Sequence, residues 1–528
     1  MPHAFGTTPQ VRKSRSVFRT DRTYKTTFDA GLLIPFYVDE ILPGDTVNFN
    51  GTLLARFNTP LTPVMDNMYL DTHFFFVPNR LVWENWERFC GAQDNPGDSV
   101  DFLIPKVTNP SAPFPRGSIA DYFGIPVTAI NLAVNALPFR AYNLIYNEFF
   151  RDQDLIDSVV VPRDDGPDNI SDFPLQRRAK RPDYFTTCRP FLQKGPEVTM
   201  PLGLTAPVVG NGKALGLTDA SANFGLGVTG GGTLSAYSGN RGDPIGTTNS
   251  GSILASSKAV GVTGDPNLSG LKADLLNATA SSINTLRLAF LQQAKYEIDA
   301  RSGTRYVEYL YAHFGVVSPD FRLQRPEYLG GASQRLDFHS VPATTQNADK
   351  DLGDLAAFGI STGTGHDFVK SFVEHGFVIG LVSARADITY QRGLHRMWSR
   401  STIDDYYLPI YAHLGEQAVL NSEIFAQGTS ADDGVFGYQE RWSEYRYGVS
   451  MITGKLRSTD PQSLDVWHLS QEFSSLPTLS KTFIEDNPPV DRVVAVPSEP
   501  HFIFDSYLSI RHTRAMPVRS IPAMLNHF

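Results

Sequence analysis

The alternation of apolar and polar side chains predicts β-strands in two regions near the ends of the chain. In residues 45–57 the odd positions are mostly apolar and the even positions are polar, which is the period of a half-buried strand. Residues 68–78, MYLDTHFFFVP, place several apolar side chains on one face. The same alternation follows the apolar start of residues 376–390 and recurs at 463–469 and 501–510. These runs are the clearest strand signals in the sequence.

The predicted strands must pair non-locally, because residues 79–375 separate the first group from the second. A Greek-key sandwich or a jelly roll allows such pairing, since long insertions can leave from strand ends without breaking the hydrogen-bonded ladder. The composition agrees with this fold class. Aromatic residues make up 12% of the chain, and 43 glycines and 36 prolines favour strands joined by irregular loops.

Helices are predicted inside the insertions, where apolar residues recur at helical spacing. Asn79 is a candidate N-cap for a helix that Gly91 ends, and Pro138 is placed to open a second one. Two more helices are predicted at 282–303 and 305–314. We expect their apolar faces to pack inside the protein. In the third helix this face consists of Ile283, Leu286, Phe290, Leu291, Ala294 and Ile298.

Residues 201–270 differ from the rest of the chain in composition. Glycine occupies 16 of these 70 positions against 43 of 528 overall, and large apolar residues are few. Such a segment cannot support its own core, so we interpret it as a long surface protrusion, with a neutral insertion as the alternative. An Arg241-Gly242-Asp243 tripeptide lies within it and is either a receptor contact or a polar turn. The candidate protrusion residues are Gly230, Tyr237, Arg241 and Asp243.

Charge is distributed unevenly between the ends and the body of the chain. The formal net charge is −9, but residues 1–26 carry +5 and residues 511–528 carry +3, which leaves −17 for residues 27–510. Basic ends on an acidic body are typical of tails that bind a polyanion, although termini are also charged simply to stay hydrated. Cations can follow a phosphate backbone, and Phe18 and Tyr24 could stack on unpaired bases. The candidate nucleic-acid-binding residues are Arg12, Lys13, Arg15, Arg19, Arg22, Lys25, Arg511, Arg514 and Arg519.

Short motifs for enzyme chemistry are present but lack the context that they need. Residues 359–363, GISTG, match the nucleophile-elbow pattern, yet no buried strand precedes the serine and no helix follows it. The two cysteines exclude a disulfide scaffold, and the twelve histidines show no metal-ligand spacing. We therefore expect no enzyme activity, no cofactor and no metal. A converging carboxylate pair of the glycosidase type is left open.

Targeting signals are also missing from the printed sequence. It begins without the apolar core of a signal peptide, and no run of 18 apolar residues follows. We expect a protein that is neither secreted by that route nor inserted in a membrane.

Several long stretches rich in tryptophan, tyrosine and arginine carry a family resemblance. Together they span most of the chain outside residues 201–270, and they resemble the major capsid protein of microviruses (Microviridae), in particular its gokushovirus branch. The stretches are residues 68–91, 137–153, 286–316, 325–331 and 437–448, and the C-terminal AMPVRSIPAML.

The resemblance implies an eight-stranded viral jelly roll with long loop and helical insertions. It implies a structural protein of the virion, assembled in the bacterial cytoplasm, of which sixty copies close a T=1 icosahedron around circular single-stranded DNA. Its implied partners are further copies of itself, an internal scaffolding protein, a pilot protein, a small DNA-packaging protein and a bacterial surface receptor. The implied receptor contact is an insertion raised at the three-fold axes, where residues 201–270 would fall.

Two other functions remain open at this point, a jelly-roll carbohydrate-binding or carbohydrate-active protein and a trimeric receptor-binding spike. The organisation that we expect is a basic arm, first strands, a loop and helix insertion, a protrusion, a helical insertion, the remaining strands and a basic tail. Their expected bounds are 1–28, 29–80, 81–200, 201–270, 271–373, 374–510 and 511–528.

Overall fold

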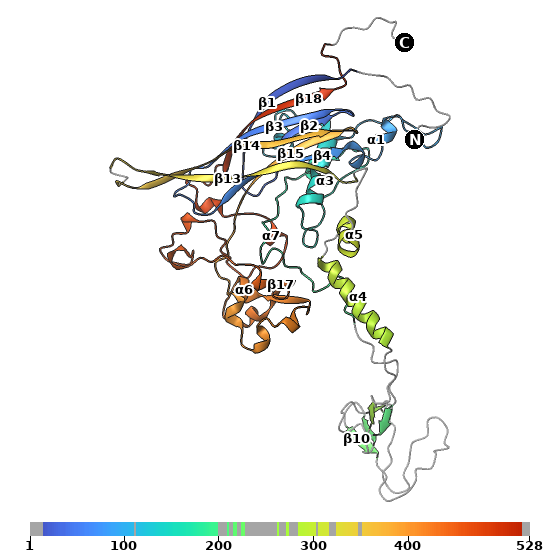
Figure 1. The fold of residues 1–528 in the computed structure, drawn as a ribbon, viewed down its shortest axis with the longest axis vertical. Helices are drawn as coiled ribbons and strands as arrows, with labels where there is room; N and C mark the ends of the chain where they lie inside the picture. Colours follow the sequence, from blue (N-terminus) through green and yellow to red (C-terminus); the bar gives the residue numbers. More distant parts are fainter. Residues whose placement is uncertain are drawn as a thin grey trace, which may run out of the picture. The chain divides into compact units, whose positions relative to one another are not determined.

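Eight antiparallel strands form a nearly closed barrel in the computed structural model of the chain (Figure 1). Their order is β1-β18-β3-β14-β13-β4-β15-β2. The bounds are Ser16–Phe28 for β1, Ile34–Ile41 for β2, Thr46–Phe57 for β3, Met68–Pro78 for β4, Glu327–Pro342 for β13, Leu355–Ser371 for β14, Gly376–Ala386 for β15 and Phe502–Arg514 for β18. The structure describes residues 14–109, 112–198, 208–210, 215–218, 223–226, 261–262, 271–273, 283–301, 305–315, 324–346 and 351–519.

The barrel consists of two four-stranded halves joined by the β13–β14 pair. We call β1-β18-β3-β14 the terminal sheet, because it holds the first and last strands, and β13-β4-β15-β2 the insertion sheet, because both long insertions leave from it. β3 pairs with β18 on one side and β14 on the other, as the non-local pairing of the two ends requires. The predicted jelly roll is confirmed. The first strand begins at Ser16, which corrects the expectation that the strands follow a basic arm ending at residue 28.

The barrel core lies between the two halves and is rich in aromatic rings. In β3 every second side chain from Val47 to Phe57 is buried, which confirms the strand and the face predicted from its alternation. Phe49 lies at the centre, and its ring centroid is 4.8 Å from Tyr37, 4.7 Å from Phe74 and 5.2 Å from Phe368. The predicted strands at 68–78, 376–390 and 501–510 are confirmed as β4, β15 and β18.

β4 and β15 of the insertion sheet are buried on both faces, because the first insertion, which runs from residue 79 to 326, packs against their outer side through residues between 81 and 175. α3 (Leu137–Ile145) covers β4 and β15 and forms a second core with Trp83, Phe139 and Tyr142 at its centre. Inside this layer the Arg140 guanidinium donates to both oxygens of Asp168 at 2.6 and 2.7 Å, and both side chains are buried. This pairing compensates for burying the charges.

The described remainder of the first insertion consists of short elements, apart from two helices. The short strands β8 to β12 and α4 belong to a separate compact unit, residues Gln193–Arg301. The bounds are Trp86–Phe89 for α1, Lys106–Thr108 for β5, Ile119–Tyr122 for α2, Ala133–Asn135 for β6, Tyr146–Phe150 for a π-helix, Asp168–Asn169 for β7, Val208–Gly210 for β8, Leu215–Thr218 for β9, Asn223–Leu226 for β10, Gly261–Val262 for β11, Leu271–Ala273 for β12, Ile283–Arg301 for α4 and Tyr306–Phe314 for α5.

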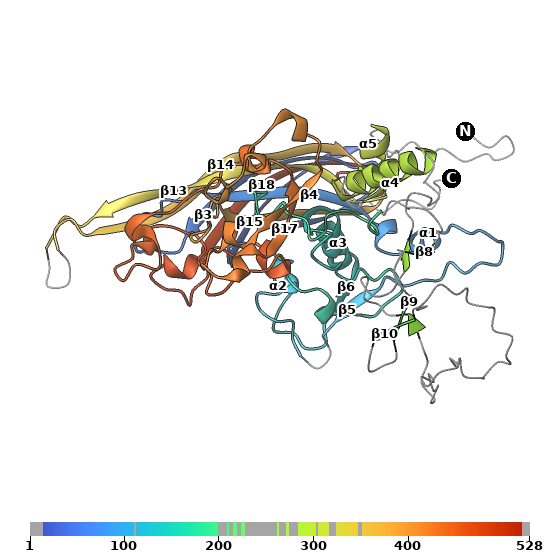
Figure 2. The ribbon, with the colours of Figure 1, turned by 90° about the horizontal axis from the view of Figure 1, so that it is seen from below.

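The second insertion, residues 387–501, forms a third core against the first (Figure 2). Phe425, Phe436 and Phe483 pack there on Tyr184 and Phe185 of the first insertion. Its elements are β16 (Glu416–Leu420), which pairs with β17 (Val435–Glu440), α6 (Asn421–Ile424) and α7 (Lys481–Ile484). Short 3-10 turns connect them, at Arg396–Ser399, Ile403–Asp405, Pro409–Tyr411, Ser430–Asp433, Ser443–Tyr445, Gly454–Leu456, Asp465–Trp467 and Val490–Arg492.

Two local predictions are wrong. The helix expected from Asn79 to Cys90 is split into a 3-10 turn at Asn79–Leu81 and the four residues of α1, because Trp83 is held by a 2.7 Å bond from its indole nitrogen to Asp165. The strand expected at 463–469 is a 3-10 turn at Asp465–Trp467, since His468 bonds to the Leu456 carbonyl instead of a strand partner.

The other three helix predictions are confirmed as α3, α4 and α5, but the packing expected for α4 is wrong. Its apolar residues are exposed, including Ile283 at 68%, Phe290 at 63% and Leu291 at 70%. The pattern predicted the helix correctly but not what would cover it.

Phe49→Ala should lower the free energy of unfolding of the subunit by about 3–5 kcal/mol, because it leaves a cavity among three aromatic rings in a fully buried position. Chemical denaturation measures the loss. Phe290→Ala on α4 is the matched control and should change the stability of the isolated subunit by less than about 0.5 kcal/mol. Equal losses for the two variants would contradict the assignment of the core.

Candidate nucleic-acid interface

Among the described residues, none of either insertion covers the outer face of the terminal sheet. In β18 the side chains alternate between buried and accessible along the strand, and in β3 every even position from Asn48 to Arg56 is exposed. We call this surface the bare face. The strand register places on it Val17, Arg19, Asp21, Thr23, Lys25 and Thr27 of β1, Ile503, Asp505, Tyr507, Ser509, Arg511 and Thr513 of β18, Thr46, Asn48, Asn50, Thr52, Leu54 and Arg56 of β3, and Thr362, Asp367, Val369 and Ser371 of β14.

Hydroxyl, amide and cationic groups dominate one end of the bare face. Arg19 of β1 stands directly opposite Arg511 of β18, which in turn is opposite Asn48 of β3. Like charges directly opposite each other are unfavourable in a sheet, so a bound anion between them would relieve the repulsion. Arg19 also pairs with Asp21 at 2.9 Å, and this bond together with one from Ser509 lowers the pKa of the Asp21 carboxyl.

The half-exposed ring of Tyr507 lies between Thr23 and Thr52 in the same surface. An aromatic ring among hydroxyl and amide groups can stack on an unpaired base while its neighbours contact sugar or phosphate. The bare face therefore has the groups needed for sequence-independent contact with a single strand of nucleic acid.

The two ends of the chain leave the terminal sheet side by side. The β1–β18 register ends with Ser16 opposite Arg514, so the segments before β1 and after β18 start from adjacent positions. The sequence places Arg12 and Lys13 just before this point, and Arg519 just after it. The structure thus brings the starts of both basic tails to one corner of the bare face, although they are far apart in sequence.

Three of the predicted cations, Arg15, Arg22 and Arg514, bridge separate elements where the barrel closes. Arg22 lies 4.6 Å from the centroid of the Tyr37 ring and 3.6 Å from Asp39, so it bridges β1 and β2 where the barrel closes. Arg514 donates to Asp45 at 2.8 Å and to the Glu40 carbonyl.

Arg15 donates to the carbonyls of Gly44 and Thr513 and to the Thr46 hydroxyl. Arg15 therefore links the β2–β3 turn to the end of β18. Arg514, at the end of β18, makes a similar link to Asp45 in the same turn. Arg15, Arg22 and Arg514 hold the barrel closed, so they have less freedom to reach a ligand than the cations of the bare face.

Asp39 is the acidic centre of this closure. Its burial alone would raise the pKa, but a 3.1 Å contact with the buried His512 and the charge of Arg22 outweigh burial and lower it. The Asp39 carboxylate is therefore held ionised between the Arg22 guanidinium and the His512 ring, which stabilises the closure of β1 on β2 above the ordinary pKa of an aspartate.

The remaining predicted residues have different outcomes. Arg19, Lys25 and Arg511 lie on the bare face, and Lys25 pairs there with Asp505. Arg519 is exposed beyond β18. Arg12, Lys13 and the protrusion residues Gly230, Tyr237, Arg241 and Asp243 lie outside the described residues.

Sequence reasoning missed several residues of the bare face. Asn48, Asn50, Thr52 and Arg56 were recognised as the polar side of a strand, but nothing in the sequence indicated that this side stays uncovered. For Tyr507 the sequence indicated only a position in an alternating strand pattern and no contact with nucleic acid.

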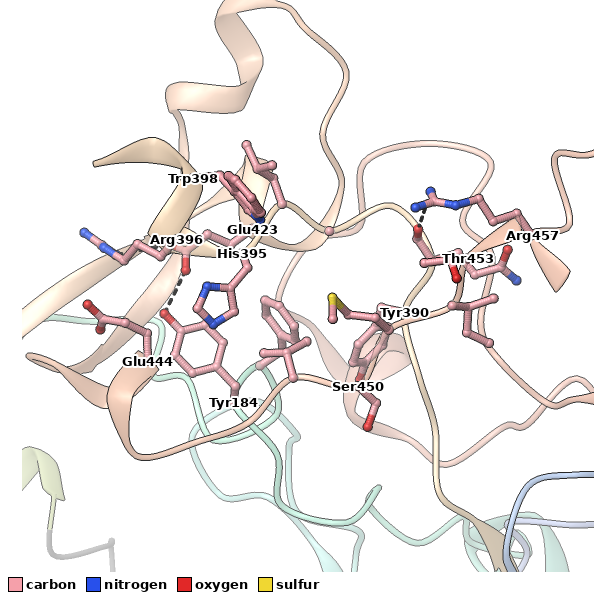
Figure 3. A pocket seen from close by; sticks show the side chains of 17 residues that line it. Tyr184, Tyr390, His395, Arg396, Trp398, Glu423, Glu444, Ser450, Thr453 and Arg457 are labelled. Atoms are coloured by element: carbon pink, nitrogen blue, oxygen red, sulfur yellow. Dashed lines mark hydrogen bonds and ion pairs between the residues drawn. The ribbon is translucent and has the colours of Figure 1, made fainter. Parts of the chain in front are cut away.

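A pocket of about 230 Å³ lies where the second insertion meets Tyr184 and Phe185 of the first (Figure 3). Two carboxylates, Glu423 and Glu444, line it, so it is a candidate place for a glycosidase-type acid pair. Glu423 accepts from the Tyr184 hydroxyl at 2.8 Å and from Arg396 at 3.0 Å, and its burial raises its pKa. Glu444 accepts from Arg400 at 3.1 Å and from Gln417 at 2.7 Å. With each oxygen engaged by a side-chain donor, the pair fits an internal ion-pair network better than acid–base catalysis.

The GISTG motif lies inside β14, and its serine is buried. The Ser361 hydroxyl donates to the Arg335 carbonyl at 3.0 Å, within the sheet. This geometry confirms that the motif is not a nucleophile elbow, which requires a turn between a strand and a helix. Among the described residues, no group of three or more His, Cys, Asp or Glu could hold a metal ion, and no helix is long and apolar enough to cross a membrane.

Large aromatic and apolar side chains are exposed on the second insertion. Trp398, Ile403 and Ile410 are 70%, 70% and 83% accessible. We call this region the aromatic surface. Apolar side chains exposed in such number are typical of protein–protein contacts. Its members are Met397, Trp398, Ile403, Tyr406, Tyr407, Ile410, Leu414, Tyr445, Tyr447 and Met451.

Comparison with known proteins finds one family whose model matches residues 7–524, described as Capsid protein (F protein). Capsid protein VP1 of Bdellovibrio phage phiMH2K is 47% identical, with 100% of this chain and 98% of the relative covered. Capsid protein VP1 of Chlamydia phage 1 is 43% identical over 99% of this chain and 98% of the relative. Capsid protein VP1 of Spiroplasma virus 4 is 36% identical over 94% of this chain and 93% of the relative.

Arg22→Gln should lower the free energy of unfolding by about 1 kcal/mol, because it removes a cation–π contact and an ion pair at the barrel seam. Arg511→Gln, which removes a cation from the bare face, should leave stability within about 0.5 kcal/mol. Denaturant titration of both variants measures the difference. If Arg511→Gln proved the more destabilising, the division between closing and surface arginines would be incorrect.

Proposed function

Since this chain belongs to the Capsid protein (F protein) family of phages and is therefore a structural capsid protein, we propose that sixty copies form a T=1 shell around a circular single-stranded DNA genome, with the bare face directed inward. The observation that carries this proposal is the convergence of both chain ends at one corner of the bare face. The basic tails would start there on the genome side, while the acidic remainder of the chain contacts neighbours and solvent.

The uneven cover of the two sheets supports this orientation. The first insertion buries the outer side of β4 and β15, so these strands cannot meet nucleic acid directly. The terminal sheet offers hydroxyls, amides, Arg19, Arg511 and the ring of Tyr507 instead. Contacts of this kind bind phosphate, sugar and base faces without reading sequence, as a shell around a whole genome requires.

Contacts between copies would involve the aromatic surface of the second insertion. Interfaces of obligate assemblies bury apolar and aromatic side chains at their centres, and tryptophan, tyrosine and arginine dominate their energetics. Trp398 and Ile410 are too exposed in the single subunit to contribute to its own core. We place them against a neighbouring copy in the shell.

The remaining partners follow from the family resemblance. They are an internal scaffolding protein, a pilot protein and a small DNA-packaging protein, with assembly in the bacterial cytoplasm. Residues 201–270 would form the surface protrusion that contacts a bacterial receptor, with Tyr237, Arg241 and Asp243 as its exposed chemical groups. The composition of this segment, rich in glycine and poor in large apolar residues, supports display over packing.

Negative-stain microscopy of the chain co-expressed with its viral partners tests the shell directly. Uniform round particles containing nuclease-resistant DNA are the expected result. Monomers or free trimers, with the partners confirmed present, would contradict the proposal and make glycan binding at the pocket beside Trp398 the next assay.

Loss of bare-face cations should weaken the salt dependence of DNA binding. Each phosphate contact on a single strand contributes about 0.7 to the slope of log affinity against log salt, so Arg19→Gln with Arg511→Gln should reduce its magnitude by about 1.4. Fluorescence anisotropy with an oligonucleotide of single-stranded DNA measures the slope. A control pair, Arg88→Gln with Arg446→Gln, removes one exposed arginine from each insertion, away from the bare face. An equal loss in both double variants would argue against a specific role for the bare face.

A further inference from the structure

The outer half of the β13–β14 pair extends beyond the barrel (Figures 1 and 2). β13 pairs with β4 only as far as Leu336 opposite Met68, and β14 pairs with β3 only from Ile360 opposite Arg56. Between these limits Asp337–Pro342 pairs with Leu355–Ile360, and no other described strand adds to either edge. We call this two-stranded segment the distal hairpin.

The base of the distal hairpin is fixed to the barrel core. The Phe338 ring meets Phe57 edge-on at 5.4 Å. Gly359 lies between them, and a Cβ at that position would come within 2.8 Å of Phe338 and 2.9 Å of Phe57. The hairpin therefore projects from a rigid base in a set direction.

One side of the distal hairpin is apolar and exposed. Val341 is 46% accessible and Phe358 is 40%, and the His339 ring stacks on Phe358 at 5.1 Å. Leu352, beyond the last pair, is 69% accessible. The register carries this side into Ile360 and, beyond the exposed Arg56, to Ile503, at the end of the bare face away from Arg19 and Arg511.

A two-stranded hairpin is marginal in water unless something covers its apolar side and its open edges. Polyanions are poor candidates for this cover. The described residues 337–346 and 351–360 contain no lysine or arginine, whereas Asp337, Asp351 and Asp354 are acidic. A protein surface is the remaining class of partner, and copies of this chain are the protein that a shell supplies in every orientation required by its symmetry.

We propose that the distal hairpin is an arm that docks on a second copy of this chain in the shell, with Val341 and Phe358 buried in the contact. The inference rests on the proposed shell function. It assigns a role to a segment of which only the base, at Phe338, packs on the barrel core. It also divides the bare face between an end with Arg19 and Arg511 for nucleic acid and an end with Ile503 for the neighbouring subunit.

A shortened hairpin tests the arm without disturbing the barrel. Replacing residues 340–357 with Asn-Gly joins the His339–Phe358 pair by a two-residue turn and keeps the pairs Leu336–Met68 and Ile360–Arg56. We expect the circular dichroism spectrum to match that of the unaltered subunit, and the yield of particles on co-expression with the viral partners to fall at least about tenfold, since an apolar interface contact is lost. Particles at the normal yield would overturn the arm and leave the shell proposal intact.

Point variants distinguish a specific contact of the distal hairpin from a general effect of losing exposed apolar surface. Val341→Ser and Phe358→Ser should each reduce particle yield, whereas Val373→Ser, at a position 84% accessible outside the hairpin, should not. Equal yields for all three variants would overturn the proposal. Failure of the unaltered chain to form particles would instead overturn the shell function, and the inference with it.

Cross-linking identifies the occupant of the contact. A photoreactive phenylalanine analogue at position 358, in particles assembled from a mixture of isotopically light and heavy chains, should join light to heavy chains. Products confined to a single chain, or joining position 358 to the scaffolding protein or to DNA, would overturn the assignment to a second copy.

Discussion

The unequal burial of the two sheets is the constraint on which the other features of this subunit depend. Both long insertions leave from strands of the insertion sheet, and the first of them folds back over the outer side of β4 and β15. β4 and β15 are therefore buried on both faces, while β3 and β18 keep strict alternation between core and solvent. This asymmetry leaves a broad and mostly polar surface on the terminal sheet.

The pairing of the first strand with the last one gives this surface its charge. Because β1 lies beside β18, Arg19 meets Arg511, and both basic ends of the chain start from one corner. Because successive side chains of a strand point to opposite faces of the sheet, the position of each arginine along β1 decides whether it closes the barrel or lies on the bare face. Arg22 points towards Tyr37 and Asp39 and closes the barrel, whereas Arg19, an odd number of residues away, lies on the bare face. Arginine thus stabilises the barrel at position 22 and is available for contact with nucleic acid at position 19.

The sequence predicted the elements whose signal is local. The alternation in β3 identified the strand and its buried side, and Pro138 marked the start of α3. It failed where a tertiary contact decided the outcome, as at Trp83, whose bond to Asp165 interrupts the expected helix, and at His468 in the expected strand. Likewise, the polar side of β3 was visible in the sequence, but whether an insertion would cover it depended on the path of a chain segment far away.

Ultraviolet cross-linking of DNA inside intact particles, followed by mass spectrometry of the attached peptides, tests the orientation of the subunit most directly. The account predicts that cross-linked peptides come from residues 14–28, 46–57 and 502–514, with Tyr507 among the sites because its ring is half-exposed on the bare face. Cross-links concentrated in residues 79–198 or 387–501, with none in the terminal sheet, would contradict it.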